Sequence, residues 1–171
     1  MELDEITEIK QHSKDKEFIL KKVSENGNAI EYADESLKKD KEIVMTAVKN
    51  AGESLEYVYT HFKNDKEIFM EAIKTFPWVI CYANEELTND YELIKKCAKS
   101  YGQTLYFASQ SLRDNDDIVK VAVANKGIVI KYASDRLKKD LEIAKIAITN
   151  DKKAKMFIDE ELRNNEEIKN M

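Results

Sequence analysis

The residues that could catalyse a reaction or bind a metal are few and lie far apart in this chain. His12 and His61 are 49 positions apart, and neither accompanies a Cys, a Ser or paired carboxylates in a known catalytic arrangement. Cys81 and Cys97 form no CxxC motif and have no histidine beside them. We therefore expect no catalytic residue, no metal site and no cofactor, and we interpret both cysteines as small core residues in a reducing compartment.

Acidic side chains recur at a fixed spacing that indicates a structural role in a repeated fold. The phrase that begins Asp15-Lys16-Glu17 returns every 25 residues. Its starting residues are Asp15, Asp40, Asp65, Asp90, Asn115, Asp140 and Asn165. Asp and Asn are preferred N-caps, so each start predicts the beginning of a helix. Because the spacing places successive caps on different helices, we do not expect these acids to form a metal site.

Each 25-residue unit predicts a long helix followed by a shorter one. In the second unit, the amphipathic stripe of a helix of about three turns consists of Ile43, Val44, Ala47 and Val48. A helix-breaking column follows, with Gly27, Gly52, Gly102 and Gly127, and with Pro77 in the third unit. We interpret these glycines as residues that end the long helix in the left-handed conformation. The spacing of Ile30, Ala33 and Leu37 then predicts a short second helix.

A fixed period without insertions is typical of stacked repeats that bury apolar faces only against their neighbours. Six units cover residues 15–164, with an N-terminal cap at 1–14 and a C-terminal partial repeat or cap at 165–171. The last segment fits either a short capping helix or the start of a further unit in a longer array. The sequence therefore predicts an all-α fold, a right-handed α-solenoid of six 25-residue helix-pair repeats.

Composition disfavours two classes of partner. Lys and Arg total 28 and Asp and Glu total 33, so charges of both signs mix and the net charge is -5. Nucleic-acid binding is unlikely on this basis, because it requires a concentrated basic surface. The longest apolar-rich run, residues 75–83, is too short to cross a bilayer, and no signal peptide is recognisable. We expect a cytoplasmic protein with no membrane contact.

Aromatic residues interrupt the polar columns in the middle of the chain. We predict that they form a binding patch for a protein or peptide partner, because aromatic residues are enriched at binding hot spots. The patch comprises Phe76, Trp78, Tyr91, Tyr101 and Tyr106. The alternative is that these rings only repack the junction around Pro77.

A second column is basic. Two residues before each new start stand Lys38, Lys63, Arg113, Lys138 and Arg163, with Thr88 as the exception. Stacked units would align these side chains along one edge. They indicate either a solvated loop edge with weak ion pairs or a ridge that binds RNA or another anion.

The units resemble the bacterial repeats known as domain of unknown function 4116, whose pattern runs approximately DKEIVLAAVKNNGLALEYASEELKND. The closest stretches are residues 40–52 (DKEIVMTAVKNAG), 29–40 (AIEYADESLKKD) and 127–140 (GIVIKYASDRLKKD). The likeness covers nearly the whole chain. It implies a helical repeat, and it implies no biochemical activity, because the family has none assigned.

These features together predict a non-enzymatic interaction scaffold or adaptor. The alternative is an RNA or anion binder that uses the basic edge. An enzyme that the motifs do not reveal is the third candidate.

Overall fold

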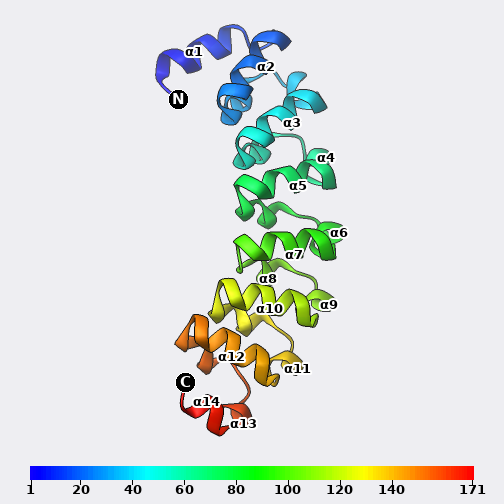
Figure 1. Cartoon of the computed structure of the whole chain (residues 1–171). Helices are drawn as coiled ribbons and strands as arrows, with labels where there is room; N and C mark the ends of the chain where they lie inside the picture. The colour runs from blue at the N-terminus through cyan, green and yellow to red at the C-terminus, as the bar shows by residue number, and fades with distance from the viewer. The chain divides into compact units, whose positions relative to one another are not determined.

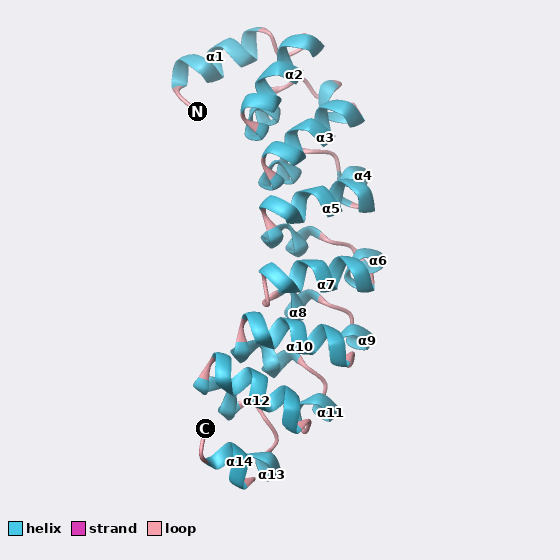
Figure 2. Cartoon of the chain, viewed as in Figure 1, coloured by secondary structure: helices cyan, strands magenta, loops and turns pink.

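All the regular secondary structure in the chain is helical, as expected. The computed structural model describes all 171 residues, and none lies in a β-strand (Figure 2). The chain divides into two compact units, Met1–Asn84 (unit 1) and Glu85–Met171 (unit 2).

Unit 1 begins with a helix that packs on the first repeat and continues with repeated helices. Its elements are α1 (Leu3–Gln11), α2 (Lys16–Glu25), η1 (Gly27–Tyr32), η2 (Leu37–Lys39), α3 (Lys41–Asn50), η3 (Gly52–Tyr57), α4 (Thr60–Lys63), α5 (Lys66–Thr75) and η4 (Pro77–Tyr82). The long helices α2, α3 and α5 pack side by side in chain order (Figure 1).

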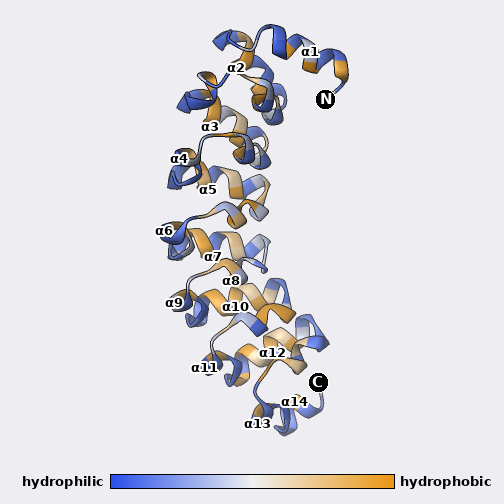
Figure 3. Cartoon of the chain, turned by 180° about the vertical axis from the view of Figure 1, so that it is seen from behind, coloured by the Kyte–Doolittle hydropathy of each residue, from blue (hydrophilic) through white to orange (hydrophobic).

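Unit 2 repeats the same order. Its elements are α6 (Glu85–Thr88), α7 (Tyr91–Ser100), α8 (Thr104–Phe107), α9 (Gln110–Arg113), α10 (Asp116–Asn125), η5 (Gly127–Tyr132), α11 (Asp135–Lys138), α12 (Leu141–Asn150), η6 (Lys152–Met156), α13 (Glu160–Arg163) and α14 (Glu166–Lys169). Its long helices α7, α10 and α12 also pack in chain order. In Figure 3, α10 and α12 are largely hydrophobic, whereas the short helices α9 and α11 are mostly hydrophilic.

The predicted N-caps are confirmed. The Asp40 carboxylate accepts hydrogen bonds from the backbone N–H groups of Glu42 and Ile43, at 2.9 and 3.4 Å. Asp140 does the same for Ile143 at 2.8 Å. These bonds satisfy donors that have no partner within the helix, so each repeat starts its ten-residue helix at a defined position.

The predicted short second helix has a different form. In most repeats the chain after the long helix winds into a 3₁₀ segment, as in Gly27–Tyr32, and a separate helix of three or four residues follows. Ala33 between them is extended, with φ -69° and ψ 155°. Each repeat therefore has three helical pieces, of which only the first is long.

The interpretation of the glycines is wrong, because no residue in the chain has a positive φ. A Cβ on Gly27 would lie 2.2 Å from the carbonyl oxygen of Ala47, and a Cβ on Gly127 would lie 2.1 Å from that of Ala147. Each alanine belongs to the long helix of the next repeat. Glycine is required here because two backbones touch, and not because of an unusual φ.

An amide side chain at the end of the next long helix completes this contact. The Oδ1 atom of Asn125 accepts from the Gly102 N–H at 2.7 Å, and its Nδ2 donates to the carbonyl of Lys99 at 3.0 Å. Asn150 makes the equivalent bonds to Gly127 and Ala124, at 2.6 and 2.8 Å. This inter-repeat amide clamp satisfies a carbonyl in the last turn of the preceding helix, a group that lacks an intrahelical partner.

The close backbone contact predicts that Gly127→Ala destabilises the protein by about 3 kcal/mol, because the added Cβ collides with a backbone oxygen that cannot rotate away. Gly127→Asn should be equally harmful, although Asn tolerates the left-handed conformation. Gly102→Ala should cost less, because the nearest oxygen is 2.6 Å from its Cβ position. Urea unfolding measures these differences. A stable Gly127→Asn variant would contradict the steric explanation.

The amide clamp predicts a graded series at position 125. Asn125→Ala leaves the part-buried Gly102 N–H without a partner and should cost about 2 kcal/mol. Asn125→Thr should cost about half as much, because Thr75 shows that a threonine hydroxyl can accept the equivalent N–H, that of Gly52, at 2.8 Å. Equal unfolding free energies for the wild type and Asn125→Ala would show that the clamp does not stabilise the fold.

Candidate interaction surface

The segment after each long helix presents two side chains outward. Residues i and i+3 lie on the same side of a 3₁₀ helix. In η1, Asn28 and Glu31 lie toward solvent, while Ala29 and Ile30 are fully buried. Asn28 Nδ2 donates to Glu53 Oε1 of the next repeat at 2.7 Å, so equivalent positions in neighbouring repeats are adjacent.

We call these two outward positions in successive repeats the segment face. In unit 1 the segment face consists of Asn28, Glu31, Glu53, Glu56, Trp78 and Cys81. In unit 2 it consists of Gln103, Tyr106, Ile128, Lys131, Lys153 and Met156.

Large hydrophobic side chains are exposed mainly on these segments. Apart from Met1 and Leu3, the exposed ones are Trp78 (44%), Tyr82 (36%), Tyr106 (55%) and Met156 (64%). Trp78, Tyr106 and Met156 belong to the segment face, and Tyr82 ends the same segment as Trp78. Exposed apolar side chains on the segment face of a unit indicate an interaction site on that unit.

Tyr106 is part of a ring cluster in unit 2. Its ring centroid lies 5.0 Å from that of Phe107 and 5.0 Å from that of Tyr132, in edge-on geometry. Gln103 Nε2 donates to the Tyr132 hydroxyl at 3.2 Å. The Nζ of Lys131 lies 4.8 Å from the Tyr132 centroid. Neighbouring repeats therefore hold Tyr106 in place while leaving much of its surface accessible.

The segment face of unit 2 becomes basic beyond this cluster. Lys131 Nζ also lies 5.8 Å from the centroid of Phe157. An apolar depression of about 530 Å³ lies here, lined by Lys152, Lys153, Lys155, Met156 and Arg163. A second depression in unit 2, of about 560 Å³, lies elsewhere. Lys155 donates to the carbonyl of Ile168 at 2.7 Å. The remaining cations and the exposed Met156 provide charge and apolar surface together.

The segment face of unit 1 is acidic. Glu53 and Glu56 are exposed and Glu31 is half-buried. Burial, together with the negative charges of Glu31, Glu56 and Glu53, raises the pKa of Tyr57 above its ordinary value. The negative charges of all three carboxylates therefore act on one tyrosine.

The members of the predicted aromatic patch are divided between the two units. Phe76 and Trp78 belong to unit 1, and the other three belong to unit 2. Tyr91 begins α7 and Tyr101 follows its end, so about 15 Å of helix lies between them. Phe76 and Tyr101 are half-buried, and each follows the last residue of a long helix. Of the three in unit 2, Tyr106 is the exposed ring.

Tyr91 has a structural role that the sequence did not reveal. Its hydroxyl donates to Asp117 Oδ2 at 3.2 Å and accepts from Lys95 Nζ at 2.7 Å. In unit 1 the same position holds Lys16, whose Nζ lies 2.8 Å from the Asp40 carboxylate and lowers the pKa of that group. Tyr91 therefore replaces a lysine that links the starts of two successive long helices.

Three of the five residues of the predicted basic edge interact with neighbouring groups. Lys38 and Lys138 each pair with an acid three residues earlier, at 3.0 and 3.3 Å. Lys63 Nζ donates to the carbonyl of Glu56 at 2.9 Å and lies 5.1 Å from the Tyr82 centroid. Arg113 is half-buried. Arg163 is exposed and lines the apolar depression beside Met156.

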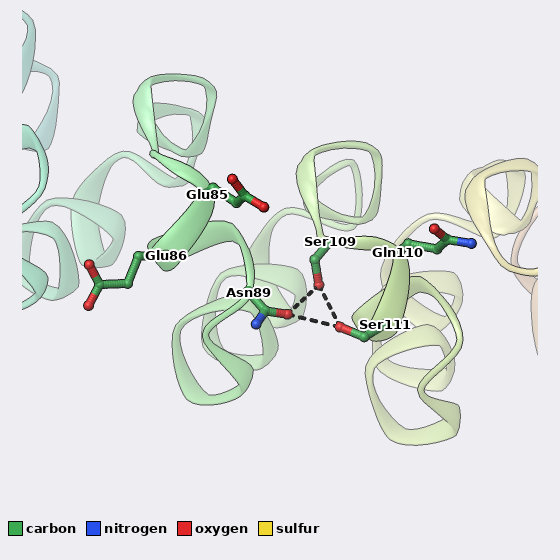
Figure 4. A pocket seen from close by; sticks show the side chains of 6 residues that line it. All are labelled: Glu85, Glu86, Asn89, Ser109, Gln110 and Ser111. Atoms are coloured by element: carbon green, nitrogen blue, oxygen red, sulfur yellow. Dashed lines mark hydrogen bonds between the residues drawn. The ribbon is translucent and has the colours of Figure 1, made fainter.

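A polar pocket in unit 2 joins two repeats. It is lined by Glu85, Glu86, Asn89, Ser109, Gln110 and Ser111. Figure 4 shows both serine hydroxyls turned toward Asn89, whose Oδ1 accepts from Ser109 at 2.7 Å and from Ser111 at 2.9 Å. The Ser109 N–H also donates to the Thr88 carbonyl at 2.9 Å. Both hydroxyls donate their protons to the amide oxygen of Asn89, and not to a side chain that could act as a base and activate them as nucleophiles.

Each of the two histidines lies beside a phenylalanine ring. His12 stacks on Phe18 with centroids 4.9 Å apart, and His61 lies 3.9 Å from the ring of Phe62. No group of three His, Cys, Asp or Glu side chains is arranged to hold a metal ion. The chain also contains no helix with the length and apolar character needed to span a bilayer.

Cys97 is fully buried, and the Thr104 hydroxyl donates to its sulfur at 3.1 Å. Burial raises the pKa of the Cys97 thiol to about 11. Cys81 is half-buried, and burial raises its pKa as well.

Comparison with known proteins identifies the repeats. The sequence model of the family described as Domain of unknown function (DUF4116) matches residues 15–63, 65–113 and 115–154. No curated protein and no solved structure matches the chain.

The two thiols should differ in reactivity. At pH 8 we expect iodoacetamide to alkylate Cys81 before Cys97, because the Cys97 thiol is fully buried and its pKa of about 11 keeps it protonated. Mass spectrometry of Cys81→Ser and Cys97→Ser variants over time measures each thiol alone, and both should react at similar rates in urea. Faster alkylation of Cys97 in the folded protein would contradict its burial.

Proposed function

This chain belongs to the family described as Domain of unknown function (DUF4116), and we propose that it is a non-enzymatic scaffold or adaptor that binds a protein or peptide partner. The family match covers most of the chain with consecutive copies of one sequence unit. The proposal therefore rests on the surface that these repeats present.

We infer that the repeats form a right-handed α-solenoid. In both units the same contacts join successive repeats, namely the glycine against an alanine carbonyl and the clamp from the end of the next helix. Repetition of one junction along a chain is how solenoids are built. A bacterial, cytoplasmic setting is part of this proposal, because the repeats resemble bacterial ones and both cysteines are free thiols.

The observation that carries the proposal is the exposure of Tyr106. More than half of its surface is accessible, although its ring is held by Phe107 and Tyr132. A positioned tyrosine supplies a large contact area with little loss of conformational entropy on binding. Met156 adds apolar surface in the same column, and Lys131 between them adds positive charge.

Quantitative affinity capture tests the proposal. The wild-type chain, Tyr106→Ala and Lys96→Ala are each incubated with an extract of the source cells treated with nuclease. Lys96 is the control because it is exposed on the long helix α7, outside the segment face. A partner should be recovered with the wild type and Lys96→Ala, and at least about tenfold less with Tyr106→Ala, as expected for a hot-spot tyrosine.

Circular dichroism must show that all three proteins are folded. If the recovered proteins are the same for all three, the segment face is not the binding surface. If a partner is recovered only from a parallel extract without nuclease treatment, binding depends on nucleic acid and the scaffold proposal fails.

A further inference from the structure

The segment face carries opposite charges in the two units at equivalent positions. In unit 1, Glu31 and Glu56 occupy the second outward position, and Glu53 occupies the first. In unit 2, Lys131 occupies the second outward position and Lys153 the first. Each unit therefore has one sign of charge on this face.

These charges do not neutralise one another within a unit. Glu53 accepts a hydrogen bond from the neutral amide of Asn28, and Lys131 lies over the rings of Tyr132 and Phe157. Burying either face against an apolar partner would leave its charges unpaired, which is costly. A suitable partner for one face carries the opposite charge.

The chain itself offers such a surface. The acids of unit 1 and the lysines of unit 2 carry opposite charges, and the 22-residue spacing of Glu31 and Glu53 recurs in Lys131 and Lys153, so the charges of the two faces are complementary. Exposed apolar side chains accompany both, with Trp78 in unit 1 and with Tyr106 and Met156 in unit 2. Ion pairs between exposed side chains contribute little alone, so burial of these apolar groups would supply most of the affinity.

We propose that the partner of the segment face is a second copy of this chain, with the acidic face of unit 1 in each copy bound to the basic, aromatic face of unit 2 in the other. The assignment rests on the proposed function, because it names the partner of the same surface. A twofold axis makes the contact twice and closes the assembly as a dimer.

Sedimentation equilibrium of the full chain tests the proposal. A dimer has a mass of 2 × 19.8 = 39.6 kDa, and its association should weaken as salt is raised because its exposed ion pairs are screened. Lys131→Glu and Glu56→Lys should each weaken dimerisation about tenfold or more, since each substitution places like charges together twice. The double variant restores opposite charges and should dimerise within about threefold of the wild type.

Lys96→Glu is the matched control, because it reverses an exposed charge of unit 2 outside the segment face and should leave dimerisation unchanged. A mass of 19.8 kDa at the highest soluble concentration overturns the proposal. It is also overturned by a double variant that stays as weak as the single ones, or by assemblies larger than a dimer.

The two proposals fail in different ways. If the wild type is a monomer and captures a protein that Tyr106→Ala does not capture, the proposed function holds and the partner is not a second copy. If the dimer persists in Tyr106→Ala and no partner is captured through the segment face, both the proposed function and the proposed dimer contact are contradicted.

Discussion

The structure depends on one contact between backbones. At Gly27, Gly52 and Gly127 the chain lies so close to the next long helix that a Cβ would come within 2.2 Å of a carbonyl oxygen. Such a contact fixes how far apart two repeats lie, and it places a backbone N–H where water is largely excluded. That N–H requires a partner, which the side chain at the end of the next long helix provides. The glycine and the clamp are therefore two parts of one junction.

The local chemistry of each repeat could be predicted from sequence, whereas contacts between repeats could not. An N-cap depends on one residue and the three that follow, so Asp40 and Asp140 were identified correctly. The glycine column indicated that a side chain is not tolerated at this position. It did not indicate the cause, because the carbonyl oxygen that a Cβ would strike lies 20 residues further along the chain. The clamp was missed because its column varies, with Asn50, Thr75 and Asn125 all able to accept the same kind of hydrogen bond.

The same limit applies to the surface residues. Tyr106 replaces a glutamate of earlier repeats, and an aromatic ring at a polar, outward position remains exposed in the structure. Tyr91 also replaces a polar residue, but its hydroxyl takes over the ionic contact of that residue with the next repeat. Sequence identifies a departure from the repeat pattern, and only the position of the next repeat shows whether the new side chain has a structural partner.

Both units build the segment face with the same backbone contacts, although its outward side chains differ. Gly52 and Gly127 meet the next helix in the same way, yet the outward side chains that follow them differ in charge, with Glu53 and Glu56 after one and Lys131 after the other. The junction does not require either sign. An exposed Met156 does not add to the core either, and exposed apolar surface carries a risk of aggregation. The junction between repeats therefore does not determine the pattern of charge and apolar surface on this face.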